Sequence, residues 1–266
     1  PVFLKVIIIV MIGHYIWMAL LYTIAGVYSG KNPLEVVKHY GPAYLTAVGT
    51  MSSAATLGVA LQCAGKAKSL RKDMVQFGIP LFANIHLCGS VLTEVFFCMT
   101  ISQILYGKLP SIPTMFLFCI LLGVFAIGAP GVPGGTVMAS LGLITGVLLF
   151  DDAGTALMLT IFALQDSFGT ACNVTGDGAL TLILTGYAER HKIPEQKSET
   201  DLMQWMRFLN GKRREDFEKM AKKNSCFEEA YKELDKLSAD EKKRLEYEAR
   251  QKAIRDRDIL IKTGEN

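Results

Sequence analysis

The chain has 266 residues, 50% of them hydrophobic, and a net charge of +3, but its charge is very unevenly distributed. Residues 1–186 carry only eight Lys/Arg and seven Asp/Glu, whereas residues 187–266 carry twenty and eighteen. This excludes one large soluble domain and predicts that the first part inserts into a membrane. Several of its apolar runs approach the roughly 20 helical residues that cross about 30 Å of hydrocarbon.

The cysteines are scattered, which excludes a disulfide framework and a zinc site of the usual spacing. They form no CxxC pair and are typical of small buried apolar residues. The six are Cys63, Cys88, Cys98, Cys119, Cys172 and Cys226. The chain begins at Pro1 directly inside an apolar segment, so we expect an N-terminal truncation rather than a cleaved signal peptide.

Five apolar segments follow one another, alternately long and broken in the middle. The long ones are predicted transmembrane helices, and the broken ones are predicted re-entrant hairpins whose arms are too short to span. In chain order they are a span at 2–28, a hairpin at 41–64, a span at 74–106, a hairpin at 112–150 and a span at 156–186. Gly/Pro-interrupted segments in two halves indicate inverted repeats whose hairpin tips meet near the bilayer middle.

Basic residues in the loops predict the orientation. In this topology the loops at 29–40 and 65–73 share a side with the chain's charged end, and those at 107–111 and 151–155 face the other side. The first pair carries six Lys/Arg and the second only Lys108. The charged end is therefore predicted to be cytoplasmic.

Residues 191–266 are predicted to form a cytoplasmic helical tail. Their charges of both signs are interspersed, which is typical of solvated helices rather than of a nucleic-acid patch. A structural or assembly role is expected, with regulation or partner binding as the alternative. The predicted fold class is thus an all-α integral membrane protein of the cell membrane, with an inverted-repeat transport domain over 1–190 and this tail.

One helix face in the last span carries four polar residues. At about 100° per residue, offsets of four, seven and eleven from Asp166 fall within about 40° of it, so Asp166, Thr170, Asn173 and Asp177 form one stripe. An ionisable residue inside a span costs at least ~2.5 kcal/mol, so two carboxylates on one stripe indicate function. Structural carboxylates are the alternative. Gly169 on the same face leaves room for a ligand or marks close helix packing.

The two hairpin tips are candidate ligand sites, because half-helix N-termini attract carboxylates and half-helix C-termini attract cations. Ser52, Ser53 and Thr56 add hydroxyl groups to the first tip. At the second tip, the run from Gly131 to Gly134 allows close approach and a hinge, although a tight structural turn is the alternative.

The histidines in two of the spans are expected to have different roles. His86 is either a neutral core residue or a titratable group facing the stripe, with an ordinary pKa of about 6.5 that suits proton exchange. His14, alone in the first span, is expected to be structural or interfacial.

These motifs together resemble one known family, the dicarboxylate/amino acid:cation symporters, which include the glutamate transporters. The resemblance covers residues 1 to about 190, in the family's order and spacing. The matching pieces are Ser52-Ser53-Ala54-Ala55-Thr56-Leu57, Ile79-Pro80-Leu81, Gly89, Gly131-Val132-Pro133-Gly134 and Asn173-Val174-Thr175-Gly176-Asp177.

The resemblance implies a homotrimer in membrane lipid, whose transport domains move past a fixed scaffold as elevators. This chain would hold the C-terminal half, without most scaffold spans. Asp166 would bind the substrate's amino group, and Asn173 and Asp177 would contribute to a sodium site. The substrate-binding set expected from stripe, tips and resemblance is Ser52, Ser53, Ser90, Val132, Gly134, Asp166, Gly169, Thr170 and Asn173. The set expected for cation binding or coupling is His86, Cys88, Asn173 and Asp177.

Departures from the family pattern shift the expected substrate and ion. Where the family's middle span reads Asn-Met-Asp-Gly-Thr, this chain has His86 and Cys88 in place of the Asn and Asp. Sodium favours oxygen ligands, so at least one sodium site is expected to be lost or rebuilt. Gly169 stands where an arginine would grip an acidic side chain, which disfavours a second substrate carboxylate.

The leading hypothesis is a secondary active symporter for a small, neutral amino acid or related carboxylate, coupled to Na⁺ or H⁺ and needing no enzymatic cofactor. The alternatives are a standard sodium-coupled glutamate/aspartate or C4-dicarboxylate symporter, and a non-transporting homologue or channel. An intramembrane aspartyl protease is disfavoured, because its carboxylates normally lie on different helices and its Gly-x-Gly-Asp pattern is absent. No enzyme activity and no nucleic-acid partner are expected.

Overall fold

A computed structural model gives the fold and describes residues 2–195, 204–205, 208, 214–222 and 225–236. The chain divides into two compact units, residues 1–197 and 198–266, which are described separately. All regular elements among the described residues are helices, as the predicted all-α class requires. The parts of the predicted helical tail at 196–203, 206–207, 209–213, 223–224 and 237–266 lie outside the described residues.

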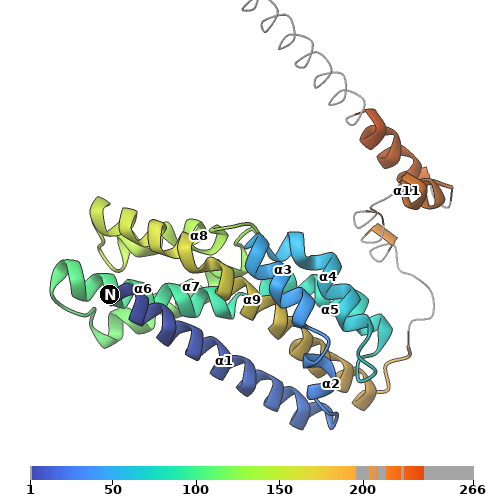
Figure 1. The fold of residues 1–266 in the computed structure, drawn as a ribbon, viewed down its shortest axis with the longest axis horizontal. Helices are drawn as coiled ribbons and strands as arrows, with labels where there is room; N and C mark the ends of the chain where they lie inside the picture. The colour runs from blue at the N-terminus through green and yellow to red at the C-terminus, as the bar shows by residue number, and fades with distance from the viewer. Residues whose placement is uncertain (1, 196–203, 206–207, 209–213, 223–224, 237–266) are drawn as a thin grey trace, which may run out of the picture. The chain divides into compact units, whose positions relative to one another are not determined.

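The first unit contains the predicted apolar segments in order (Figure 1). Its helices are α1 (Val2–Ser29), α2 (Leu34–Val37), α3 (Gly41–Thr50), α4 (Ser53–Gly65), α5 (Lys72–Ile85), α6 (Cys88–Tyr106), α7 (Ile112–Ile127), α8 (Gly135–Gly146) and α9 (Asp152–Arg190).

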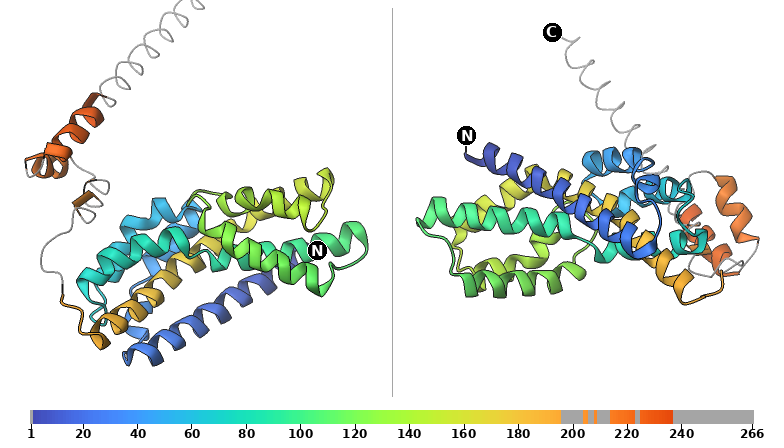
Figure 2. Two further views of the ribbon diagram at one scale, coloured as in Figure 1. Left: turned by 180° about the vertical axis from the view of Figure 1, so that it is seen from behind. Right: turned by 90° about the horizontal axis from the view of Figure 1, so that it is seen from below.

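Helix α9 is the central element of this unit. It packs against α1, α3, α5 and α6, and it runs between α1 and α5 (Figure 2). Its 39 residues extend about 58 Å, beyond the expected 156–186 at both ends. At its start the Asp151 carboxylate accepts a hydrogen bond from the Gly154 N–H at 2.9 Å, which lowers the pKa of Asp151.

The first broken segment forms a helical hairpin of α3 and α4. Met51 ends α3 in the left-handed region at φ 52°, and Ser52 begins α4 as its N-cap, accepting from the Ala55 N–H at 3.1 Å. The hydroxyls of Thr50 and Thr56 lie 3.1 Å apart across the turn. Local side-chain capping therefore stabilises this tip.

The second broken segment forms a hairpin of α7 and α8. Gly128 ends α7, and Gly134 precedes α8 with φ at 72°, a conformation that strains other residues. Within the tip the Val132 N–H donates to the Pro130 carbonyl at 2.8 Å. Glycine and proline, rather than hydroxyl caps, thus shape this tip.

The segment expected to span at 74–106 is not one regular helix, because it is interrupted between α5 and α6. His86 ends α5 with extended dihedral angles (φ −105°, ψ 94°), and Leu87 precedes α6 at φ −120° and ψ 26°. The Gly89 N–H, which begins the second half, donates to the side-chain oxygen of Asn173 at 2.7 Å. The Asn173 side chain of α9 therefore accepts a hydrogen bond from a backbone N–H that the interruption leaves without a partner within its own helix.

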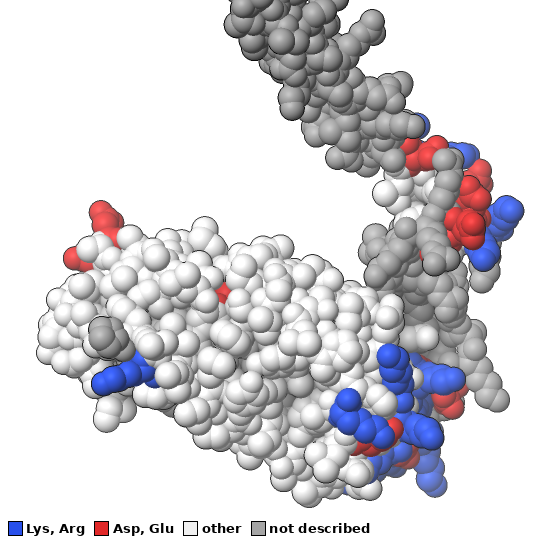
Figure 3. Space-filling model, in the orientation of Figure 1, with Lys and Arg blue, Asp and Glu red and all other residues white. Residues whose placement is uncertain are grey.

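Two stretches are long and apolar enough to cross a membrane by length and composition: Val2–Ser29 and Lys72–Tyr106, with mean hydropathies of 2.1 and 1.5. Charged side chains of the first unit gather toward its two ends, and the face between them is almost uncharged (Figure 3). Helix α9 is long enough to span, but it buries many polar side chains.

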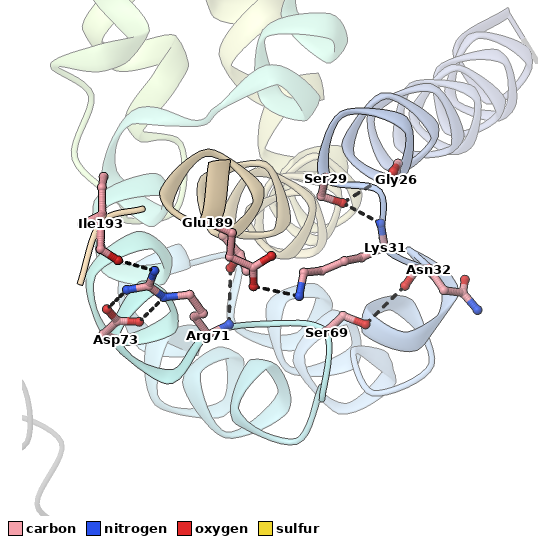
Figure 4. A network of polar contacts seen from close by, with 10 residues as sticks. Gly26, Ser29, Lys31, Asn32, Ser69, Arg71, Asp73, Glu189 and Ile193 are labelled. Atoms are coloured by element: carbon pink, nitrogen blue, oxygen red, sulfur yellow. Dashed lines mark hydrogen bonds and ion pairs between the residues drawn. The ribbon is translucent and has the colours of Figure 1, made fainter. Parts of the chain in front are cut away.

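One end of the first unit is closed by a polar network that joins three loops (Figure 4). Lys31 pairs with Glu189 at 2.9 Å, and the Arg71 guanidinium donates to the Ile193 carbonyl at 2.9 Å. Arg71 also holds both oxygens of Asp73, which raises the pKa of Arg71.

At the opposite end the Tyr106 hydroxyl donates to Asp151 at 2.7 Å. This contact joins the 107–111 and 151–155 regions. The network at the other end gathers the loops around residues 31 and 71 beside the C-terminus of α9.

Helices α6 and α9 approach each other closely at a pair of glycines. A Cβ built on Gly89 would lie 2.5 Å from the Gly169 carbonyl oxygen and 2.7 Å from Cys172 Cβ. A Cβ on Gly169 would lie 3.2 Å from Ser90 Cα. This backbone-to-backbone contact fixes the distance between α6 and α9, the two helices that make most of the contacts of the polar stripe.

The second unit contains α11 (Arg214–Ala221) and a helical segment at 225–236. An aromatic cluster holds its described residues together. Phe208, Met220 and Phe227 are buried, and Phe217, Ala230 and Tyr231 pack against them. The rings of Phe208 and Phe227 are stacked at 5.5 Å.

We predict that Gly89→Ala destabilises the first unit, because its methyl group must push two helix backbones apart. Overpacking of this kind costs about 1–3 kcal/mol. Gly142→Ala in α8 is the matched control, since no atom lies within 4 Å of its added Cβ, and alanine favours helix. The thermal unfolding midpoint in detergent should fall only for Gly89→Ala. Equal midpoints for the two variants would contradict the close packing.

We predict that Phe227→Ala loosens the second unit, because Phe227 is only 1% exposed and fills its cluster. Removing a core phenylalanine costs about 3–5 kcal/mol, which is large for so small a unit. Limited proteolysis of the full chain should then cut after residue 197 faster than in the parent. Lys232→Ala, at an exposed ion pair with Glu228, should leave that rate unchanged. If both variants were cut at the rate of the parent, the role of the cluster would be refuted.

Candidate functional site

The four predicted stripe residues of α9 are all buried inside the first unit. Asp166, Thr170, Asn173 and Asp177 are between 1% and 4% exposed. In a low-dielectric interior each needs partners, since an unsatisfied buried polar group costs free energy. The partners come from two places: the hairpin tips and the start of α6.

Asp166 is held by the second hairpin tip. Its Oδ2 accepts from the Gly134 backbone N–H at 2.7 Å, while Oδ1 lies 3.5 Å from the hydroxyls of Ser90 and Thr170. The strongest partner of this buried carboxylate is therefore a backbone N–H on a glycine-rich turn. An ammonium group can offer the same kind of donor.

The two tips also contact each other. The Ser52 hydroxyl donates to the Gly131 carbonyl at 2.6 Å, and the Ala54 N–H lies 3.3 Å from the same oxygen. One carbonyl of the second tip thus faces the beginning of α4, where N–H groups and the helix dipole attract a negative partner.

A small cavity lies between the tips and the stripe, with a volume of about 10 Å³. That is room for one water molecule rather than for an amino acid, so the tips are closed on the site. Its lining residues are Met51, Ser53, Leu87, Ser90, Pro130, Gly131, Val132, Thr136, Asp166 and Thr170.

Most of the expected substrate-binding residues gather at this cavity. Ser53, Ser90, Val132, Asp166 and Thr170 line it, and Ser52 and Gly134 bond to residues that line it. Gly169 and Asn173 do not. Gly169 packs under Ser90, and Asn173 donates to the Ser90 hydroxyl at 2.9 Å.

Sequence reasoning missed several lining residues, including Leu87 and Thr136. Leu87 lies in the α5–α6 interruption, where no Gly/Pro run like those of the two tips marks a break. Thr136 is 5% exposed in the first turn of α8. Its place just after the glycine-rich tip was the one signal that could have identified it.

The residues expected to bind a cation form a second polar group, further along α9. His86 Nδ1 lies 3.0 Å from Asp177 Oδ1 and 3.2 Å from the Asn173 carbonyl oxygen. Cys88, which begins α6, is half-buried. Within the part of the chain that the structure describes, no three His, Cys, Asp or Glu side chains gather as a metal site.

The donor atoms of this second group fit sodium poorly. Asn173 and Asp177, the residues expected at a sodium site, each have one oxygen facing the His86 Nδ1, and Cys88 offers sulfur, whereas a hard cation favours oxygen. His14 lies apart from them, with Nε2 3.0 Å from both the Gly89 carbonyl and the Thr93 hydroxyl, which suits the expected structural role.

Glu94 is a buried carboxylate to which sequence reasoning assigned no role. It is 0% exposed, and one oxygen accepts from the Ser140 hydroxyl of α8. Its other oxygen, Oε2, has no hydrogen-bond partner among the described residues.

Comparison with known proteins gives two family matches. The model of the sodium:dicarboxylate symporter family matches residues 1–187. That of the PD-(D/E)XK nuclease family transposase matches residues 185–264, beginning where the first match ends.

The curated relatives are transporters rather than enzymes. Neutral amino acid transporter B(0) of Rattus norvegicus is 28% identical over 201 residues, which are 75% of this chain and 36% of that protein. The putative sodium-dependent excitatory amino acid transporter glt-4 of Caenorhabditis elegans is 30% identical over 168 residues, 61% of this chain and 32% of that protein. Excitatory amino acid transporter 3 of Mus musculus is 33% identical over 152 residues, 55% and 28% respectively.

The chain spans about a third of the length of the curated relatives it matches. Its own match to the symporter model covers more than half of its residues and includes the helix stripe and both hairpin tips described above. The chain therefore belongs to the sodium:dicarboxylate symporter family.

Proposed function

We propose that this chain forms the substrate-handling part of a secondary active symporter for a small, neutral amino acid. Transport would be driven by a cation gradient, for which Na⁺ and H⁺ are the candidates. The observation that carries the proposal is the buried Asp166 carboxylate at the closed tips, held at 2.7 Å by a backbone N–H of the second tip.

The Asp166 contact suggests how binding and gating are linked. The amino group of a substrate would take the position of the Gly134 N–H on Asp166, and the second tip would move aside to admit it. The substrate carboxylate would then meet Ser52, Ser53 and the N–H groups that begin α4, which Gly131 now occupies. Closure of the tip over a loaded site supplies the differential affinity that coupling requires.

Two features support a neutral substrate. The described residues that line the cavity include no Lys or Arg. Gly169, where the family resemblance expects an arginine, is packed against Ser90 and offers no guanidinium to a second carboxylate. The relatives' names include both neutral and excitatory amino acid transporters, and our proposal of a neutral substrate rests on these two local features.

The membrane placement that we propose follows from helix lengths. The arms α3, α4, α7 and α8 have 10, 13, 16 and 12 residues, or about 15–24 Å each. All are shorter than the roughly 30 Å of hydrocarbon, which supports re-entrant hairpins whose tips meet near the bilayer middle. The end that carries Lys31 and Arg71 would face the cytoplasm, and the protein would work as a homotrimeric elevator.

The second unit is proposed to be a cytoplasmic helical tail outside the transport site. Its nuclease-family match begins where the symporter match ends, which supports a separate module, and the role that we propose for this module is structural or in assembly.

Uptake into proteoliposomes tests the proposed substrate. With the full chain reconstituted and a Na⁺ or pH gradient imposed, labelled alanine or serine should accumulate faster than glutamate, aspartate or succinate, because no arginine binds the second carboxylate. A preference for the acidic solutes would favour a standard dicarboxylate symporter. Current without uptake of any of them would favour a channel.

Asp166→Asn should reduce amino acid uptake by roughly 10- to 100-fold, the loss expected when a charged hydrogen bond to the substrate's ammonium is removed. The asparagine oxygen can still accept from the Gly134 N–H, so the fold should be retained. Asp152→Asn, at an exposed position in the first turn of α9, is the matched control and should transport as the parent does. Normal uptake by Asp166→Asn would remove the main support for the proposed role.

A further inference from the structure

Two buried oxygens of α9 converge on one point beside the α5–α6 interruption. Asp177 Oδ1 and the Asn173 carbonyl oxygen lie 3.0 Å and 3.2 Å from a single atom, His86 Nδ1. Asp177 and His86 are 1% and 6% exposed, so water does not compete for these contacts. A carbonyl oxygen can only accept, so Nδ1 carries the hydrogen and donates it.

Asn173 and Asp177, which supply these two oxygens, are the residues expected to contribute to a sodium site. A hard cation contacts its oxygen ligands at much shorter distances than an N–H donor does, and would have to occupy the space that Nδ1 now fills. The imidazole and a sodium ion therefore exclude each other at this point.

The chain places the imidazole there by three independent features. His86 ends α5 in an extended conformation, with its N–H on the Phe82 carbonyl at 2.8 Å. Gly176 of α9 leaves the space for the ring, because a Cβ there would lie 3.2 Å from His86 Nδ1 and closer still to the ring carbon beside it. Backbone conformation, a missing side chain on α9 and a carboxylate partner thus all fit one ring position.

We propose that the His86 imidazole takes the place of a sodium ion at the Asn173 and Asp177 oxygens, so that this part of the site closes without sodium. The N–H group supplies the positive partner that the buried carboxylate requires. As a statement about coupling this rests on the proposed function, but as a statement about sodium binding it rests on the geometry of the chain.

Thermal unfolding of the purified full chain in detergent tests the proposal. Its midpoint should be the same in sodium, potassium and choline chloride at equal ionic strength. In His86→Ala the carboxylate loses its donor and the space of the ring is vacated, so sodium should become stabilising. A tenfold excess of sodium over its Kd raises the midpoint by roughly 3–6 °C for a chain of this size. The variant His86→Asn/Cys88→Asp, with oxygen ligands at both departures from the family pattern, should show an equal or larger shift.

His14→Asn is the matched control, because it removes another buried histidine that contacts neither Asn173 nor Asp177. It should change the midpoint equally in all three salts. A sodium-specific rise in the parent protein overturns the proposal, and so does a folded His86→Asn/Cys88→Asp without one. The parent measurement needs no variant to fold. A failure of uptake, by contrast, would count against the proposed function alone.

Discussion

The need to give every buried polar group of α9 a partner is the constraint on which the first unit depends. Asp166, Asn173 and Asp177 lie on one face of a helix that is packed on several sides. Their partners come from the second tip, from the start of α6 and from the end of α5. Where these segments depart from regular helix, a backbone N–H or a side chain becomes available. Each such group pairs with one buried polar side chain of α9.

The polar stripe and the two tips could be predicted from sequence, because helical periodicity and Gly/Pro breaks are local signals. The interruption at His86 could not, since residues 74–106 contain no Gly/Pro break like those of the two tips, and the Asn173 and Asp177 groups that pair with it lie far away in the chain. The role of Gly169 stayed open for the same reason. Whether a glycine admits a ligand or a neighbouring helix depends on Ser90, 79 positions away in the chain.

The boundary between the two units is visible at three levels. Composition changes near residue 187, the two family matches meet at residues 185–187, and the compact units divide after residue 197. The described aromatic cluster of the second unit is made only from its own residues. The second unit thus has a core of its own among its described residues.

The stripe serves two tasks at different depths along one helix. At Asp166 the positive partner is a backbone N–H on a glycine-rich turn, which a ligand can displace when the turn moves. At Asp177 the partner is a side chain set against Gly176, with its position fixed by the end of α5. The turn at Gly134 involves the α7–α8 hairpin, whereas displacing His86 requires disturbing the packing of α5 on α9. In the proposed mechanism, the Asp166 end of the stripe exchanges its partner for the substrate, and the His86 end keeps its partner.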